Sequence, residues 1–290
     1  MAFWKRLERS RSFRFARTLI RRYNRHDIPR QSAALSYYLL FTLFPLLIFF
    51  SALLGRLELD VQSILETLSA VLPGAVLELC ETYLDYVSHS GSDTLLWFSL
   101  VFSVYFPMRA ANCLLRGVRR AYGMGKPGNA IRYYFRVLLY TVCMLLVLTV
   151  ALVLTMVGRR FLCWLSGWLI LPAFLLSLWP WLRFLVLAVF LFVALGTLYA
   201  LAQDRPQRTR GIVPGALIAL LAWMGLSLGF SFYVENFANY SVIYGTLGAV
   251  IILLIWLYLS SVTVLLGAEL NAMLSEKKSG RNPLREENEL

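Results

Sequence analysis

Long apolar runs separated by short polar segments dominate the chain from residue 32 onward. The last of these runs, from Val242 to Leu266, contains no charged residue. At about 1.5 Å per helical residue it is about 37 Å long, which exceeds the roughly 30 Å of hydrocarbon in a bilayer. The pattern therefore predicts a membrane-spanning helix at about 242–268.

Five further runs lead to the same interpretation, so we predict an all-α membrane protein with six transmembrane helices. The acidic segment 57–94, which has no Lys or Arg, repeats apolar residues at helical spacing and predicts short amphipathic helices on the external side. The Trp-rich segment 161–180 predicts an interfacial or re-entrant helix, because a seventh crossing would separate the two basic ends of the chain. The predicted spans are about 32–55, 95–115, 133–157, 183–203, 213–233 and 242–268.

The charge pattern predicts the orientation of these spans. Only 15% of the 290 residues are charged, against about 25% in soluble proteins, so the bilayer has to solvate much of the chain. The net charge of +12 arises mainly from the arm 1–31, two loops and the tail 275–290. Basic segments stay on the cytoplasmic side, so both termini are expected there, and anionic membrane lipids are the expected partners rather than nucleic acid. The arm either lies as a helix on the membrane surface or serves only as the orientation signal.

Motifs for catalysis or metal binding are absent from the sequence. It has no HExxH, GxSxG, P-loop or GxGxxG pattern, and the four cysteines lack zinc-ligand spacing. His26 and His89 are expected to be solvent-exposed. We therefore predict no enzyme, no catalytic residue, no metal and no cofactor, and leave open whether Cys80 and Cys163 form a disulfide.

Polar residues inside the predicted spans mark a candidate binding site. Arg109 is 14 residues past Leu95, the start of its predicted span, and therefore only about 21 Å along the helix. At this depth its Cα should still lie below the headgroups, where a charge is costly unless it is paired or reaches them. We predict that Arg109 and Glu269 face one another near the cytoplasmic side, either to bind an anionic headgroup or only to fix the helix register. Candidate positions for close helix packing are Gly225, Gly229 and Gly248. The candidate cavity residues are Tyr37, Tyr38, Pro45, Tyr105, Arg109, Asn112, Tyr244, Gly245, Glu269 and Asn271.

Three stretches resemble the YihY/virulence factor BrkB family: SAALSYYLLFTLFPLL, PGALIALLAW and IYGTLGAVIILLIWLYLSSVTVLLGAELNA. The resemblance covers about residues 27–274, and the YG…W-x-Y…LLGAE-x-N pattern is its most specific part. It implies six helices with cytoplasmic termini in the bacterial inner membrane. Relatives long carried the name ribonuclease BN, which we interpret as a misassignment.

The resemblance implies transport, including lipid or lipid-linked export, or a role in envelope integrity. We therefore expect a transporter or flippase of a lipid or other anionic envelope-related molecule. The alternative is a non-transporting scaffold, with a membrane ribonuclease far behind. Whether the chain forms a homo-oligomer is left open.

Overall fold

The structure is a computed structural model that describes residues 11–56, 77, 93–147, 173–203, 212–237 and 246–278. Within these residues the chain forms helices and no strand. The elements are α2 (Arg11–Arg25), α3 (Ile28–Arg56), α6 (Asp93–Ala121), a helix whose described part is Ala130–Val147, α8 (Ala173–Leu201), α9 (Val213–Phe237) and α11 (Thr246–Lys278).

The described helices confirm an all-α membrane protein. Five segments are long and apolar enough to cross a bilayer: Ile28–Ile48, Trp97–Ala121, Ala130–Val147, Val213–Val234 and Leu247–Glu276. The helix α8 adds a shorter apolar segment, Leu185–Leu201. Six spans thus remain a prediction. The predicted external helices of 57–94, and with them Cys80, lie outside the described residues apart from Leu77, and so does Cys163.

Several helices extend beyond their predicted ends. The helix α8 already begins at Ala173, so no break separates the end of the predicted interfacial segment at Pro180 from the predicted span that starts at Arg183. A proline removes only one backbone hydrogen bond, and membrane helices tolerate that loss. The helix α11 continues to Lys278, into the predicted tail, because helical hydrogen bonding does not stop where the hydrocarbon ends.

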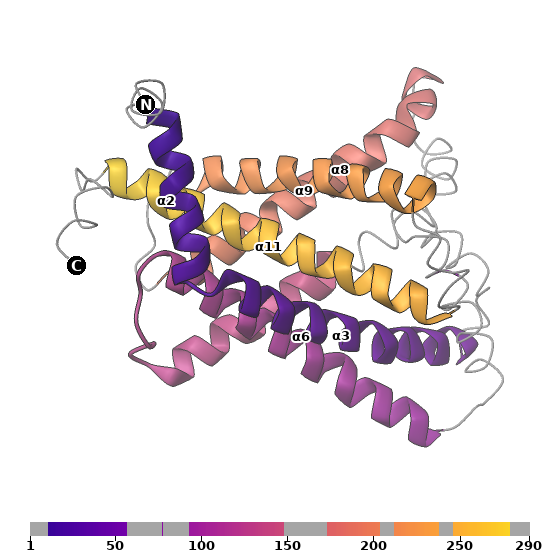
Figure 1. Ribbon diagram of the computed structural model, residues 1–290. Helices are drawn as coiled ribbons and strands as arrows, with labels where there is room; N and C mark the ends of the chain where they lie inside the picture. The colour runs from indigo at the N-terminus through magenta and orange to yellow at the C-terminus, as the bar shows by residue number, and fades with distance from the viewer. Residues whose placement is uncertain are drawn as a thin grey trace.

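The predicted N-terminal arm is divided by a turn. The helix α2 ends at Arg25, and α3 begins at Ile28, four residues before the predicted span. Between them Asp27 adopts the left-handed conformation, with a φ of 53°. The helix α2 crosses one end of the bundle at a steep angle to the spans and packs against α3 and α11 (Figure 1). The same end holds the last turns of α11 and the turn that follows α6 (Figure 1).

Small residues let the helices of the bundle approach closely. The helix pairs α3 and α6, α9 and α11, and α3 and α11 lie against one another. Gly267 faces Ala219 of α9 and Tyr199 of α8, and there is no space for a Cβ at this position. By contrast, no described atom lies within 4 Å of a Cβ placed at Gly225 or Gly229, so close approach of a neighbour there stays a prediction. Gly248 is buried.

Candidate functional site

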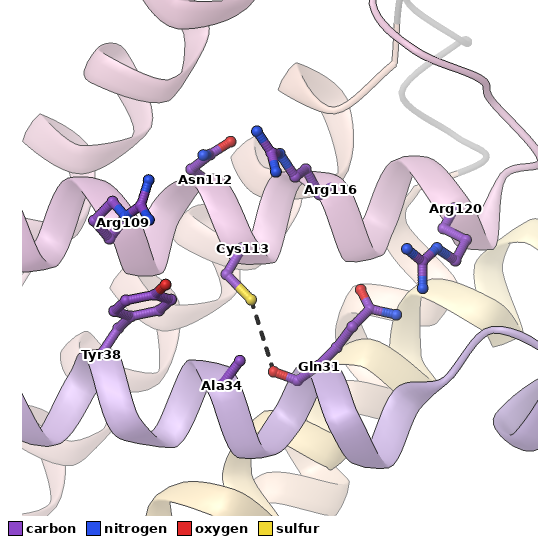
Figure 2. Close-up of a pocket in the computed structure, with 8 residues that line it drawn as sticks. All are labelled: Gln31, Ala34, Tyr38, Arg109, Asn112, Cys113, Arg116 and Arg120. Atoms are coloured by element: carbon purple, nitrogen blue, oxygen red, sulfur yellow. Dashed lines mark hydrogen bonds between the residues drawn. The ribbon is translucent and has the colours of Figure 1, made fainter.

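An open groove of about 210 Å³ lies between α3 and α6, near the end of the bundle that α2 crosses. In Figure 2 Tyr38 and Cys113 extend into the space between the two helices, whereas Asn112 and Arg116 extend from the other side of α6. None of the lining residues is a carboxylate or a histidine. The groove is lined by Gln31, Ala34, Tyr38, Arg109, Asn112, Cys113, Arg116 and Arg120.

Three arginines give the groove its charge. Arg109, Arg116 and Arg120 follow one another at i, i+7 and i+11 on α6, a spacing that places them along one face of the helix over about 16 Å. All three are solvent-exposed in the described chain. Since no acidic residue lines the groove, its positive charges are available for an oxyanion, which guanidinium groups bind through charge-assisted hydrogen bonds.

The guanidinium group of Arg109 lies among aromatic rings. Its Cζ is 5.6 Å from the ring centroid of Tyr38 and 5.9 Å from that of Tyr105, both within the range of a cation–π interaction. Among the described residues Arg109 forms no salt bridge. The structure therefore brings the predicted residues Tyr38, Tyr105 and Arg109 together, and the surroundings of Arg109 are rings and further arginines rather than a carboxylate.

The predicted contact between Arg109 and Glu269 is wrong. Glu269 is buried, with a side-chain exposure of 1%, and its Oε1 lies 2.5 Å from Nδ1 of His26, where the ring N–H donates to the carboxylate. Its Oε2 is 3.6 Å from Nη1 of Arg22. Arg22 in turn donates to Glu276 across 2.6 Å. The partners of Glu269 thus come from the N-terminal arm, and the expectation that His26 is solvent-exposed also fails, because α2 packs onto α11.

The backbone carbonyl of His26 connects this ion-pair cluster to the groove. It accepts a hydrogen bond from Nε2 of Gln31 at 2.5 Å and another from Nη1 of Arg120 at 3.0 Å. Sequence reasoning missed the roles of Arg22, His26, Gln31, Arg116 and Arg120. For the two arginines of α6, the i, i+7, i+11 spacing with Arg109 was the available signal.

The two asparagines of the predicted site have structural contacts. Asn271 is fully buried, accepts a hydrogen bond from the Gly215 amide at 2.9 Å and donates to the Ile212 carbonyl at 2.7 Å. It therefore fixes the start of α9 on α11 and does not line the groove. Asn112 does line the groove, and its Oδ1 accepts a hydrogen bond from the Tyr133 hydroxyl at 2.7 Å.

Of the other predicted residues, Tyr37 and Pro45 are described and do not line the groove. Tyr37 is exposed and stacks near Phe41, with 4.5 Å between the ring centroids. Pro45 is buried within α3. Tyr244 and Gly245 lie outside the described residues. In the described part of the chain no three His, Cys, Asp or Glu side chains come together as metal ligands.

Tyr122, just after α6, gives a pH-dependent prediction. Burial raises the pKa of Tyr122 from 10.0 to about 12, against smaller opposing effects of hydrogen bonds with Asn271 and Gln203. Between these two values the folded chain retains a proton that the unfolded chain has released, so stability falls as pH rises through this range. We expect Tyr122→Phe to lose less stability than the unmodified protein between about pH 10 and 12. Thermal unfolding midpoints along a pH series check this, and parallel curves for the two proteins would contradict it.

Comparison with known proteins gives matches over most of the chain. The sequence matches the family described as virulence factor BrkB over residues 19–289. A Bacillus subtilis (strain 168) protein named as ribonuclease-like, YfkH, is 31% identical over 264 residues, which cover 91% of this chain and 96% of the relative.

Shorter matches concern proteins named UPF0761 membrane proteins. One from Xanthomonas campestris pv. campestris (strain B100) is 44% identical over 84 residues, 29% of this chain and 20% of the relative. Another, from Pseudoalteromonas translucida (strain TAC 125), is 38% identical over 86 residues, 30% of this chain and 29% of the relative. No solved structure matches the chain significantly.

Proposed function

The chain belongs to the BrkB virulence factor family of membrane proteins, and from this premise we propose that it is an inner-membrane transporter or flippase. Its proposed substrate is a lipid or another anionic envelope-related molecule. The observation that carries the proposal is the arginine-lined groove between α3 and α6, which contains three cationic side chains and no acid.

The groove has the position that such a substrate requires. Its lining residues Gln31 and Arg120 belong to the ends of α3 and α6 that lie beside α2 and the turn after α6 (Figure 1). This end of the bundle is basic, with Lys126 and Arg132 exposed on it, and basic segments favour the cytoplasmic side. In this orientation both termini are cytoplasmic, and Arg120 lies at the membrane surface while Arg109 lies deeper in the bilayer. An anion could pass from the headgroup region toward Arg109 without leaving cationic surroundings.

Aromatic side chains continue the groove into the apolar part of the bundle. From Arg109 the contacts lead to Tyr105, then to Phe106 at 5.3 Å and to Phe41 at 5.5 Å between ring centroids. Tyr105 and Phe41 are substantially exposed. A molecule with an anionic head and a hydrocarbon tail fits this sequence of surfaces, since the head contacts arginines and the tail contacts rings.

The groove supports a binding role better than nuclease chemistry. Hydrolysis of RNA requires a general acid and base or a metal ion at the phosphate. The groove lining offers guanidinium, amide, phenol and thiol groups and no carboxylate or imidazole. The ribonuclease-like name of the Bacillus relative is therefore not extended to this chain.

Reconstituted vesicles test the proposed function. With fluorescent phosphatidylglycerol in the inner leaflet, we expect the protein to expose the lipid to an external quencher, and the double variant Arg109→Gln/Arg116→Gln to slow this about tenfold or more, since each lost charged hydrogen bond is worth about 1.5–3 kcal/mol. Lys126→Gln, which removes one exposed charge outside the groove, is the matched control and should retain the rate.

Two results would contradict the transporter proposal. One is a rate equal to that of protein-free vesicles. The other is an unchanged rate in the double variant. An inert protein that reproducibly co-purifies with an envelope-assembly enzyme would support the scaffold alternative, and RNA cleavage lost on mutation of the purified protein would support a nuclease.

A further inference from the structure

The turn between α2 and α3 belongs to two networks at once. Its His26 carbonyl accepts hydrogen bonds from Gln31 and Arg120, both of which line the groove. In Figure 2 the side chains of Gln31 and Arg120 extend toward one another at one end of the groove. The side chain of the same histidine is bound to Glu269 of α11. His26 thus joins the groove to the contact between the N-terminal arm and the last helix.

Charged contacts hold α2 on α11. Nη2 of Arg22 lies 2.6 Å from Oε2 of Glu276, and its Nη1 lies 3.6 Å from Oε2 of Glu269. The Arg22 side chain is 17% exposed. His26 completes the cluster at the end of the helix. Outside this cluster Thr18 is buried and Tyr23 packs against the apolar core, whereas most other described side chains of α2 are exposed. The position of α2 therefore depends in part on the two acids of α11 and on the geometry of the turn.

The backbone of the turn requires support. Asp27 has a φ of 53°, in a region that costs a residue with a side chain about 1–3 kcal/mol and persists only where neighbouring contacts impose it. The two hydrogen bonds to the adjacent His26 carbonyl are such contacts. Backbone hydrogen bonds of Asp27 with Asn24 and Gln31, and the bond from Arg30 to the Asp27 carboxylate, support the turn as well. The donors of the two bonds to the His26 carbonyl are also the groups that an oxyanion in the groove would attract, because a charged phosphate oxygen is a stronger acceptor than a neutral carbonyl.

We propose that α2 is a latch that opens when an oxyanion occupies the groove. This inference rests on the proposed function, because it assigns a regulation to the same binding site. A phosphate group between Arg109, Arg116 and Arg120 draws Arg120 and Gln31 away from the His26 carbonyl. The turn then loses two of the hydrogen bonds that support it, and His26 and Arg22 separate from Glu269. The arm of the substrate-free protein is closed on α11, and that of the loaded protein is released toward the membrane surface.

Thermodynamic linkage predicts the direction in which the affinity of the groove changes when the latch is weakened, and a purely structural role of α2 predicts no such change. If binding in the groove weakens the latch, then weakening the latch must strengthen binding in the groove by the same factor. Arg22→Gln removes a latch contact without changing any residue that lines the groove. We therefore expect it to increase the affinity of the groove for a phosphate compound, although it removes a positive charge from the protein.

Affinity measurements in nanodiscs of phosphatidylcholine test the linkage. The probes are inorganic phosphate and dihexanoyl phosphatidic acid, which present the same oxyanion without and with a hydrocarbon tail. We expect Arg22→Gln and Glu276→Gln each to lower the dissociation constant about fivefold or more, the range typical of coupled sites. Arg17→Gln removes an exposed charge from α2 outside the latch and should leave the affinity unchanged or slightly lower.

Hydrogen–deuterium exchange shows the movement of α2 directly. Saturating probe should increase exchange in residues 11–27 of the unmodified protein and should have no such effect in Arg109→Gln/Arg116→Gln. Binding with unchanged exchange, together with unchanged or lower affinity in Arg22→Gln, would overturn the latch and leave the proposed function standing. Absence of binding by the unmodified protein for either probe would instead count against the groove as a substrate site.

Discussion

Gly267→Leu should leave little folded protein in the membrane. In the crossing of α8, α9 and α11, a Cβ on Gly267 would meet the Cβ of Ala219 and would lie 2.5 Å from the hydroxyl oxygen of Tyr199. That hydroxyl cannot easily move away, because Tyr199 is fully buried and donates to the Val264 carbonyl at 2.8 Å. Overpacking costs about 1–3 kcal/mol for a few methylene groups, and a leucine against backbone and a fixed ring exceeds that range.

The measurement is the fraction of monodisperse protein after extraction in mild detergent, together with its thermal unfolding midpoint. Gly225→Leu is the matched control, since it makes the same change on α9 where no described atom lies within 4 Å of the new Cβ. We expect Gly225→Leu to retain the unfolding midpoint of the unmodified protein. Equal loss in the two variants would contradict the helix crossing that places Gly267 in contact and Gly225 in the open.

The contrast between Gly267 and Gly225 shows which features of helix packing can be predicted from the sequence. The spacing of Gly225 and Gly229 predicts close packing, whereas among the described glycines a new Cβ would lie within 3 Å of a neighbouring atom at Gly117, Gly215 and Gly267. A spacing identifies a face of one helix. It does not identify the helix that covers the face, because that depends on how several apolar helices pack together, and their surfaces are similar in composition.

The spans themselves could be predicted from the sequence, because each one depends on its own residues and not on its neighbours. The runs that contain α3, α6, α9 and α11 are apolar over lengths that only a membrane or a large core can accommodate, so each helix follows from its own residues. Part of the groove could also be predicted from the sequence, because Tyr38, Arg109 and Asn112 are polar residues within apolar runs. The partner of Glu269 could not, since it depends on α2 folding back across the bundle from more than 200 residues away in the chain.

Arg119→Ala should unfold the end of the bundle that α2 crosses, whereas Arg116→Ala should affect only binding. Arg119 is 4% exposed and donates to the carbonyls of Ala202 and Gly125, each at 3.1 Å. Its guanidinium group also lies over the ring of Tyr133. Hydrogen bonds from a charged group contribute about 1.5–3 kcal/mol each, so alanine should cost about 3–6 kcal/mol and leave the end of α8 without this support.

Arg116, one turn earlier on α6, provides the comparison. It is exposed and lines the groove, so its replacement by alanine should change the free energy of unfolding by less than about 1 kcal/mol. Its loss should weaken phosphate binding and slow lipid movement. The two readouts are the unfolding midpoint in detergent and the rate of fluorescent phosphatidylglycerol exposure in vesicles. A stable, fully active Arg116→Ala protein would remove Arg116 from the binding site, and a stable Arg119→Ala protein would show that the Ala202 and Gly125 carbonyls find other donors.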